Sequence, residues 1–318
     1  MKLQILALKD NIIFGCAGIG QDYGINNRKR NSFKESLKLL THAYNKDLKT
    51  YDTARAYGKS ESFLGKCFHA KQDIKIISKL DPNICSIVEK DTIEKKVLER
   101  RFFHSIESTL KNLQTNSIDS LLLHRAFHVE LCDGYLLKLL NDLIQQGIIQ
   151  KYGVSVQNRA ELDLIMAFKK INIIQLPFNI AENRWNNYFQ EFDYLAKKNG
   201  TEFHCRSIFL QGLLLSEVIE PWKKLNAEGY FYPFFSFVRK ALELTNAKDL
   251  NSLLLNFVLS HSWVNSVVVG LDSEMQINEL LDTQKLEEYD LKILKKIYEL
   301  RPTFPNILLD PSQWEQRR

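Results

Sequence analysis

The sequence predicts a (β/α)8 TIM barrel that forms a single domain over residues 1–318. Three observations lead to this prediction. Short apolar segments alternate with stretches of helical periodicity, these segments number eight, and no linker rich in proline, glycine or serine divides the chain. The eight predicted strands contain or begin at Ile13, Thr50, Ile74, Ser120, Tyr152, Ile173, Phe203 and Val267. An open doubly wound sheet is the competing topology, but the loop after the first strand lacks the G-x-G-x-x-G pattern that opens into a helix in such sheets.

The first half of the chain contains four of these strand and helix units. Residues 11–20 combine an apolar strand with a glycine-rich loop, in which Gly18 either lets the backbone approach a ligand closely or belongs to a flexible turn at the barrel edge. Apolar residues repeat at helical spacing, which predicts helices over 32–44, 60–68 and 94–112. Short β-prone runs predict strands that begin at Thr50 and that cover 74–79 and 120–124.

The second half continues the alternation with a longer excursion before the last strand. The predicted strands cover 152–155, 173–176, 203–206 and 267–269, and the predicted helices cover 135–146, 160–169, 187–199, 234–244 and 250–260. Gly147 and Gly200 are expected to end helices, because glycine readily adopts the left-handed conformation found there. The aromatic residues Trp222, 230–235 and Trp314 either line a substrate pocket or pack loops onto the barrel.

Composition excludes several function classes. The 43 basic and 38 acidic residues mostly alternate, so the net charge of +5 does not indicate nucleic-acid or membrane binding. The basic cluster at 28–30 has turn composition and is expected to be a solvated loop. No signal sequence or membrane-spanning apolar run is found, and the five cysteines are odd in number without a C-x-x-C pair. We therefore expect a cytoplasmic protein without a disulfide framework or metal site.

Polar residues stand at the ends of three predicted strands, where the active site of a TIM barrel is built. Asp52, Lys79 and His124 each close a strand, and Tyr57 lies in the loop after Asp52. Taken singly, Lys79 is interpretable as a surface lysine, Asp52 as a turn-capping carboxylate and His124 as a core histidine. Their convergence at one barrel mouth favours a shared chemical role.

Within residues 49–65, the segment from Asp52 to Gly65 reads as D-T-A-x-x-Y-G-x-S-E-x-x-L-G and resembles the signature of the aldo-keto reductase superfamily. The resemblance covers about residues 3 to 300 and implies reduction of an aldehyde or ketone, or of a sugar, with a nicotinamide cofactor. It assigns Asp52, Tyr57, Lys79 and His124 to a catalytic tetrad. Such a reduction needs hydride at carbon and a proton at the developing alkoxide. Tyr57 is the expected general acid, with Lys79 favouring its phenolate, Asp52 holding Lys79, and His124 orienting the carbonyl.

The resemblance also implies a set of cofactor-binding residues. Ser155 and Gln175 match positions that hold the nicotinamide amide. Val156, directly after Ser155, stands where the resemblance implies an asparagine that also holds this amide. Arg206 replaces the usual stacking aromatic, and a planar guanidinium also stacks on rings. The segment 207–213 resembles the one that wraps the pyrophosphate, and the segment after the last strand resembles the one that grips adenosine. These two segments and the first loop contribute Gly18, Ser207, Phe209, Gln211, Gly212, Gly270, Asp272 and Gln276.

The identity of the cofactor is left open between NADP(H), which the resemblance favours, and NAD(H). Ser273 and Gln276 have capping-box spacing, which predicts a helix N-terminus beside a phosphate-sized site. No basic residue stands between Gly270 and Glu279, whereas Asp272 and Glu274 do, and these acids would repel a 2′-phosphate.

Two other functions remain alternatives. A cofactor-binding sensor or regulatory subunit with little activity would explain the departures at Val156, Arg206 and Asp272. An unrelated barrel enzyme could use the glycine-rich loops to bind phosphorylated ligands. The expected partner is a small carbonyl compound, and the sequence does not indicate an oligomeric state.

Overall fold

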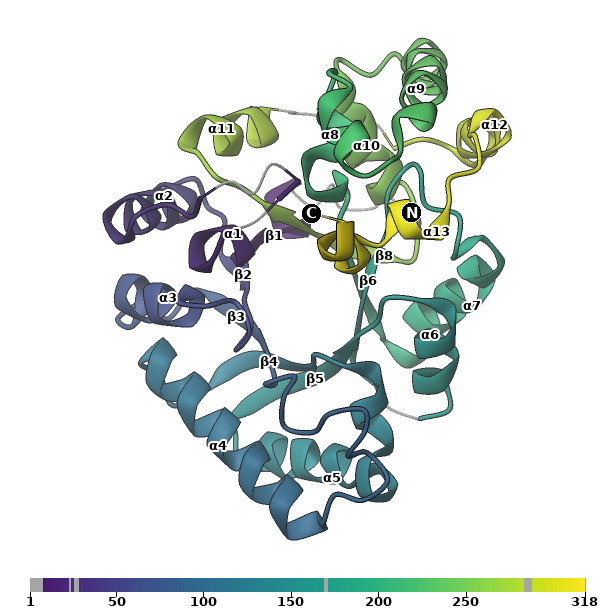
Figure 1. Cartoon of the computed structure of the whole chain (residues 1–318). Helices are drawn as coiled ribbons and strands as arrows, with labels where there is room; N and C mark the ends of the chain where they lie inside the picture. Colours follow the sequence, from purple (N-terminus) through teal and green to yellow (C-terminus); the bar gives the residue numbers. More distant parts are fainter. Residues whose placement is uncertain (1–7, 23, 26–28, 169–170, 283–287, 318) are drawn as a thin grey trace.

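Eight parallel strands form a closed barrel in chain order in the computed structural model, which describes residues 8–22, 24–25, 29–168, 171–282 and 288–317 (Figure 1). The strands are β1 (Ile12–Gly15), β2 (Thr50–Asp52), β3 (Lys75–Lys79), β4 (Ile118–Leu123), β5 (Ile149–Ser155), β6 (Ile173–Pro177), β7 (Glu202–Arg206) and β8 (Val264–Gly270). Pairing of β8 with β1 closes the barrel, with Ile12 beside Val267. The predicted (β/α)8 barrel is confirmed, and the open doubly wound sheet is wrong.

The helices surround the barrel (Figure 1). They are α1 (Ala17–Gly20), α2 (Phe33–Asn45), α3 (Ser60–Phe68), α4 (Lys95–Leu113), α5 (Leu131–Gln145), α6 (Arg159–Met166), α7 (Phe189–Tyr194), α8 (Glu220–Lys224), α9 (Phe231–Thr245), α10 (Leu250–Leu259), α11 (Glu274–Asp282), α12 (Leu291–Leu300) and α13 (Asn306–Leu309). Local chemistry sets their ends. Ser32 begins α2 through a capping box with Glu35, and Gly200, at a φ of 66°, terminates the turn that follows α7.

Two predicted helices differ from the observed ones in their backbone. The predicted helix over 187–199 is divided into a turn at Asn186–Tyr188, α7, and a π-helical turn at Leu195–Asn199. At the start of α5, residues 132–134 have positive φ angles of 47°, 58° and 78°. Regular helix therefore begins after Gly134, close to the predicted start. Sequence periodicity does not reveal these breaks, because apolar residues keep their spacing across them.

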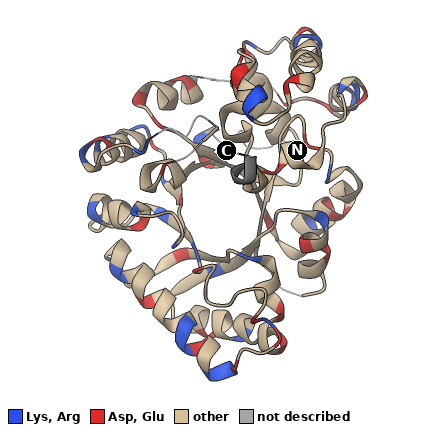
Figure 2. Cartoon of the chain, viewed as in Figure 1, with Lys and Arg blue, Asp and Glu red and all other residues tan. Residues whose placement is uncertain are grey.

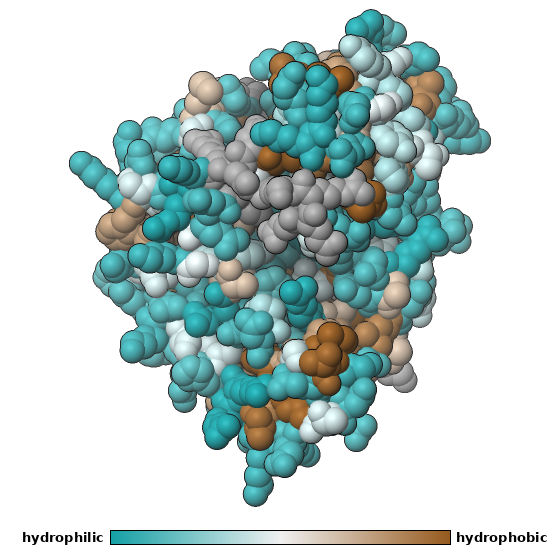
Figure 3. Space-filling model, viewed as in Figure 1, coloured by the Kyte–Doolittle hydropathy of each residue, from teal (hydrophilic) through white to brown (hydrophobic). Residues whose placement is uncertain are grey.

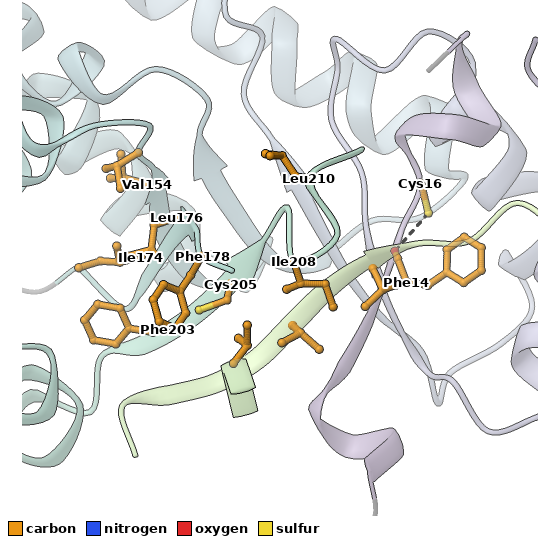
Figure 4. Close-up of a cluster of buried hydrophobic side chains, with 14 of the residues drawn as sticks. Phe14, Cys16, Val154, Ile174, Leu176, Phe178, Phe203, Cys205, Ile208 and Leu210 are labelled. Carbon is orange, nitrogen blue, oxygen red and sulfur yellow. Dashed lines mark hydrogen bonds between the residues drawn. The ribbon is translucent and has the colours of Figure 1, made fainter. Parts of the chain in front are cut away.

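The apolar core has two parts, on either side of the barrel wall. Ile13, Ile77, Leu122 and Ile173 form a small cluster, with Val268 against it. Because side chains alternate along a strand, these residues point into the barrel while their neighbours face the helices. The larger part lies between strands and helices, and Figure 4 shows a section of it with Val154, Ile174, Leu176, Phe203 and Cys205. The barrel interior is thus filled below the strand ends, which leaves those ends as the place for a site.

The predicted alternatives for surface and aromatic residues are resolved by burial. Trp222, Phe234 and Trp314 are buried in the core and do not line the cleft described below, so they pack loops onto the barrel. Lys29 and Arg30 of the basic cluster are exposed, whereas residue 28 lies outside the described residues. Basic and acidic residues are interspersed along the outer helices (Figure 2), and the face in Figure 3 is mostly hydrophilic. Within the described residues, no helix combines the length and apolarity needed to span a bilayer.

Candidate active site

Four polar side chains meet at the carboxyl ends of neighbouring strands. Asp52 ends β2, Lys79 ends β3, His124 directly follows β4, and Tyr57 lies in the loop between β2 and α3. The Lys79 Nζ lies 2.6 Å from Asp52 Oδ1 and 5.0 Å from the centre of the Tyr57 ring. The Tyr57 and His124 rings meet edge to face at 5.9 Å. The structure therefore brings together the four residues that the sequence singled out.

Asp52 and Lys79 form a buried ion pair. Asp52 is 3% exposed and Lys79 is 1% exposed, so Lys79 is not a surface lysine. The second Asp52 oxygen accepts a hydrogen bond from Gln175 Nε2 at 2.8 Å, and Lys79 also donates to the Thr53 carbonyl at 3.1 Å. Burial alone would lower the pKa of Lys79, but Asp52 and Tyr57 outweigh it and raise that pKa. An ammonium group is therefore fixed beside the Tyr57 ring.

His124 is a neutral imidazole at the cleft. Burial, together with the positive charges of Lys79 and Arg125, lowers the pKa of His124 to about 3. Its Nδ1 is buried and finds no hydrogen-bond partner among the described residues. A neutral imidazole carries one N–H, so His124 can donate a single hydrogen bond to a ligand oxygen near neutral pH.

Glycines allow the Tyr57 loop to pack tightly against α1. A Cβ on Gly20 would lie 1.9 Å from the Tyr57 carbonyl oxygen, and a Cβ on Gly58 would lie 2.4 Å from the Gly20 oxygen. Gly58 also has a φ of 54°, which side chains disfavour. The Lys59 amide donates to the Gly20 carbonyl at 3.2 Å. The backbone on both sides of Tyr57 is thus held in place.

The Ser-Glu pair of the same stretch anchors α3 beneath the site. Ser60 Oγ lies 2.7 Å from Thr53 Oγ1, next to Asp52 in the chain. Glu61 is buried and accepts hydrogen bonds of 2.8–3.1 Å from Arg55, Ser78, Thr109 and Asn112. These bonds join β3 and α4 to the start of α3. Ser60 and Glu61 of the motif therefore hold α3 in position next to the site.

A cleft of about 550 Å³ opens beside these residues. Asp52, Tyr57 and His124 line one part of it, and Lys79 lies buried behind Asp52. The lining includes every residue predicted from sequence to bind a cofactor except Gln175: Gly18, Ser155, Arg206, Ser207, Phe209, Gln211, Gly212, Gly270, Asp272 and Gln276. Residues from β1, β5, β7 and β8 thus face one common space.

Gln175 lies behind the lining of the cleft. It is fully buried and donates to Asp52, because the inward face of β6 points across the barrel to β2. Its Oε1 is buried and has no hydrogen-bond partner among the described residues. A buried acceptor of this kind needs a hydrogen-bond donor beside it, from a ligand or from water.

The loop after β7 presents backbone to the cleft. Ser207, Gln211 and Gly212 have φ angles of 60°, 54° and 88°, and a Cβ on Gly212 or Gly270 would meet no atom within 4 Å. The opposite wall is close at Gly18, where a Cβ would lie 2.9 Å from Asp272 Oδ1. Small residues and left-handed backbone let a ligand approach main-chain N–H groups, as phosphates do.

The start of α11 differs from the predicted capping box in one bond. The Gln276 amide donates to Ser273 Oγ at 3.2 Å, as predicted. The Gln276 Oε1, however, accepts from the Asp272 amide at 2.7 Å and not from the Ser273 amide. Glu274 does not line the cleft and forms an ion pair with Lys38 of α2 at 3.2 Å. Of the two acids expected near a 2′-phosphate, only Asp272 faces the cleft.

Arg206 is held by neutral acceptors at the end of β7. Its Nη2 donates to the Val156 carbonyl at 3.1 Å and to Gln157 Oε1 at 2.5 Å. Gln157 in turn donates to Asp310 Oδ1 at 2.8 Å. This chain of bonds links the cleft to the C-terminal segment.

Several cleft residues were not predicted from sequence. Arg125 and Gln157 line the cleft, and so do Pro311 and Ser312 of the turn after α13. Arg125 follows His124 and Gln157 lies two residues after Ser155, so proximity in sequence was a signal for both. The C-terminal residues carry no such signal, because only the folded chain brings them to the barrel mouth (Figure 1).

A buried ion pair braces the C-terminal segment. Arg184 contacts Glu182 at 2.5 Å and 2.9 Å through two nitrogens, and both side chains are buried. Arg184 also donates to the carbonyls of Gln157, at 2.8 Å, and Leu309, at 3.1 Å. One guanidinium thus ties the loop after β5 to the segment that reaches the cleft.

Comparisons with known proteins agree with this architecture. A model of the aldo/keto reductase family matches residues 11–299. The chain is similar to aldo-keto reductase AMT2 of Alternaria alternata, with 25% identity over 305 residues that cover 81% of this chain and 79% of that protein. Aldo-keto reductase AFTS1 of the same organism is 32% identical over 147 residues, which span 38% of this chain and 40% of that relative.

A solved structure extends the likeness to the whole barrel. The holo form of aldo-keto reductase AKR11C1 from Bacillus halodurans superposes with a TM-score of 0.73 and covers 92% of this chain and 93% of that chain. The two sequences are 21% identical. At this identity the structural similarity supports a shared fold and nothing further.

Proposed function

Because the chain belongs to the aldo/keto reductase family, we propose that it uses NADPH or NADH to reduce an aldehyde or ketone, including carbonyl forms of sugars, to the alcohol. The observation that carries the proposal is the buried Asp52–Lys79 pair beside Tyr57 and the neutral His124. This arrangement supplies a proton donor, a fixed positive charge and a neutral hydrogen-bond donor around one point of the cleft.

The residues around the cleft suit a nicotinamide dinucleotide. The orphaned Gln175 Oε1, with Ser155 nearby on β5, would take up the nicotinamide amide. The backbone of 207–212 would hold the pyrophosphate and the segment 270–276 the adenosine. The bound cofactor supplies the hydride.

Tyr57 would deliver the proton to the developing alkoxide. A free phenol, with a pKa of about 10, is a reluctant donor near neutral pH. The Lys79 ammonium would stabilise the phenolate that remains, and Asp52 would keep that ammonium in place. His124 would donate a hydrogen bond to the carbonyl oxygen and polarise it. In the oxidative direction Tyr57 would accept the proton.

The choice between NADP(H) and NAD(H) would depend on the wall near α11. Asp272 lines this part of the cleft, and its carboxylate disfavours a nearby phosphate. Replacing Asp272 with Arg is therefore expected to strengthen NADPH binding relative to NADH binding. Fluorescence titration of both variants with both cofactors measures this change.

The direct test is a cofactor titration followed by a carbonyl panel. We expect at least one reduced cofactor to bind and to be consumed with some aldehydes or ketones. Binding without turnover of any carbonyl would favour the sensor alternative. Failure of both cofactors to bind would refute the proposal. Tyr232→Phe is the matched control for changes at Tyr57, because Tyr232 is 73% exposed and lies outside the cleft.

A further inference from the structure

We propose that the substrate is a carbonyl compound that also carries a carboxylate, and that Arg125 binds this carboxylate. The proposal rests on the proposed reductase function. Arg125 directly follows His124 at the end of β4 and lines the same cleft as Tyr57. A group bound by Arg125 would therefore lie beside the residues proposed to act on the carbonyl.

The Arg125 side chain is available to a ligand. It is exposed at the cleft and forms neither a side-chain hydrogen bond nor an ion pair with any residue that the structure describes. An arginine presents up to five donors in a planar fork that matches the two oxygens of a carboxylate. Arg125 thus differs from Arg184, whose donors are taken by Glu182 and two carbonyls.

The surroundings of His124 carry uncompensated positive charge. Lys79 is neutralised by Asp52. Arg206, by contrast, bonds only to the neutral oxygens of Val156 and Gln157, so its charge is not cancelled by a described carboxylate. The positive charges of Lys79, Arg125 and Arg206 all act against protonation of His124. A negatively charged substrate would be attracted to this part of the cleft.

The acids of the cleft lie elsewhere or are engaged. Glu161 accepts a hydrogen bond from the Gln157 amide at 2.6 Å. Asp272 and Glu279 belong to the segment after β8 and to α11, on the wall assigned to adenosine. The large aromatic side chains Trp222, Phe234 and Trp314 do not line the cleft. Apart from Tyr57, the one phenyl ring in the described lining is Phe209, which belongs to the segment assigned to the pyrophosphate. The described lining therefore favours recognition of the substrate by charge over recognition by an aromatic pocket.

Matched aldehydes test the proposal. 4-Carboxybenzaldehyde and succinic semialdehyde are each compared with their methyl esters, which keep the aldehyde and the carbon skeleton that carries it but remove the charge. Because the ester of the aromatic acid makes its aldehyde more electrophilic than the carboxylate does, a preference for the acid cannot come from intrinsic reactivity. We expect kcat/KM for each acid to exceed that for its ester by about tenfold or more. Arg125→Gln should lower kcat/KM for the acids by about tenfold, mainly through KM, and leave the esters unchanged. Arg125→Lys should retain part of the preference.

A binding measurement separates this proposal from the reductase function. Calorimetry with 4-carboxybenzyl alcohol, the reduction product, should give a Kd that weakens about tenfold in Arg125→Gln and is unchanged in Arg239→Gln, which removes an exposed charge on α9. Equal kcat/KM for acids and esters, or an unaltered acid preference in Arg125→Gln, would overturn the role of Arg125 while leaving the reductase intact. If no aldehyde is reduced, the reductase function fails, and the calorimetric comparison alone decides whether Arg125 binds carboxylates.

Discussion

Replacing Lys79 with Met is expected to destabilise the fold strongly, because it leaves a buried carboxylate without its cation. The Asp52 and Lys79 side chains are 4% and 1% exposed, and their charged atoms lie 2.6 Å apart. In Lys79→Met, Asp52 would keep only the neutral donor Gln175 Nε2, at 2.8 Å. Breaking a buried pair in this way costs about 3–5 kcal/mol of unfolding free energy.

Urea unfolding, followed by tryptophan fluorescence, measures this cost. All four tryptophans are buried, so their emission reports on loss of the core. The double variant Asp52→Asn/Lys79→Met removes both charges and should recover at least about 2 kcal/mol of the loss. Lys75→Met is the matched control on the same strand, where the side chain is exposed, and should change stability by less than about 0.5 kcal/mol. A loss below about 1 kcal/mol in Lys79→Met would refute the assignment of a buried, mutually dependent pair.

Three further predictions concern close packing and pH. Gly65→Ala places a Cβ 2.2 Å from the Asn112 carbonyl oxygen, so α3 and α4 must separate. Urea unfolding should show that the free energy of unfolding falls by about 1–3 kcal/mol. Gly229→Ala is the control, because a Cβ there meets no atom within 4 Å. Gly20→Ala places a Cβ 1.9 Å from the Tyr57 carbonyl oxygen, so the loop that carries Tyr57 must shift. Steady-state kinetics should show a lower kcat, with cofactor binding retained. An unchanged kcat would mean that the loop adapts without moving Tyr57. Burial lowers the pKa of His124 to about 3 and the pKa values of His128 and His261 to about 4. The unfolded chain therefore binds more protons than the folded one between pH 6.5 and about 4, and unfolding free energy should fall as pH decreases through this range. Urea titrations at pH 7 and pH 5 that give equal free energies would contradict these low pKa values.

Strand order and most helices were predictable from sequence because barrel strands are short apolar runs and the helices keep a regular apolar face. The range predicted for α3 is the observed one, Ser60–Phe68, and the strand predicted over 74–79 differs from β3 by one residue. Apolar periodicity did not reveal the non-helical backbone at residues 132–134. Glycine in a sequence often marks a residue with positive φ, but Cys132 and Asp133 adopt positive φ without being glycines.

The convergence of the four polar residues was predictable because parallel strands bring their carboxyl ends to one edge of the barrel. Their partners were not. The bond from Gln175 to Asp52 joins residues 123 positions apart in the chain. The network of Glu61 and the contact between Gln157 and Asp310 likewise depend on tertiary neighbours that no local pattern specifies.

The electrostatic state of His124 also required the structure. The sequence indicated a histidine at a strand end, but the burial and the surrounding charges that keep the imidazole neutral come from several strands. The structure was also needed to show that Arg206 bonds to carbonyl oxygens and not to a carboxylate, so that no bonded carboxylate balances its charge. Residue identity suggested the chemistry, and packing decided how the charges around the site are balanced.

The most direct test of the account is hydride transfer in a single turnover by Tyr57→Phe. Stopped-flow absorbance of the reduced nicotinamide, with the carbonyl substrate found in the panel, follows this step, while fluorescence titration checks that the variant still binds cofactor. The account predicts unchanged cofactor affinity and a rate reduced by about a hundredfold or more, because the proton donor is lost. Tyr232→Phe should react at the wild-type rate. A Tyr57→Phe rate equal to that of wild type would contradict the assignment of Tyr57 as the general acid.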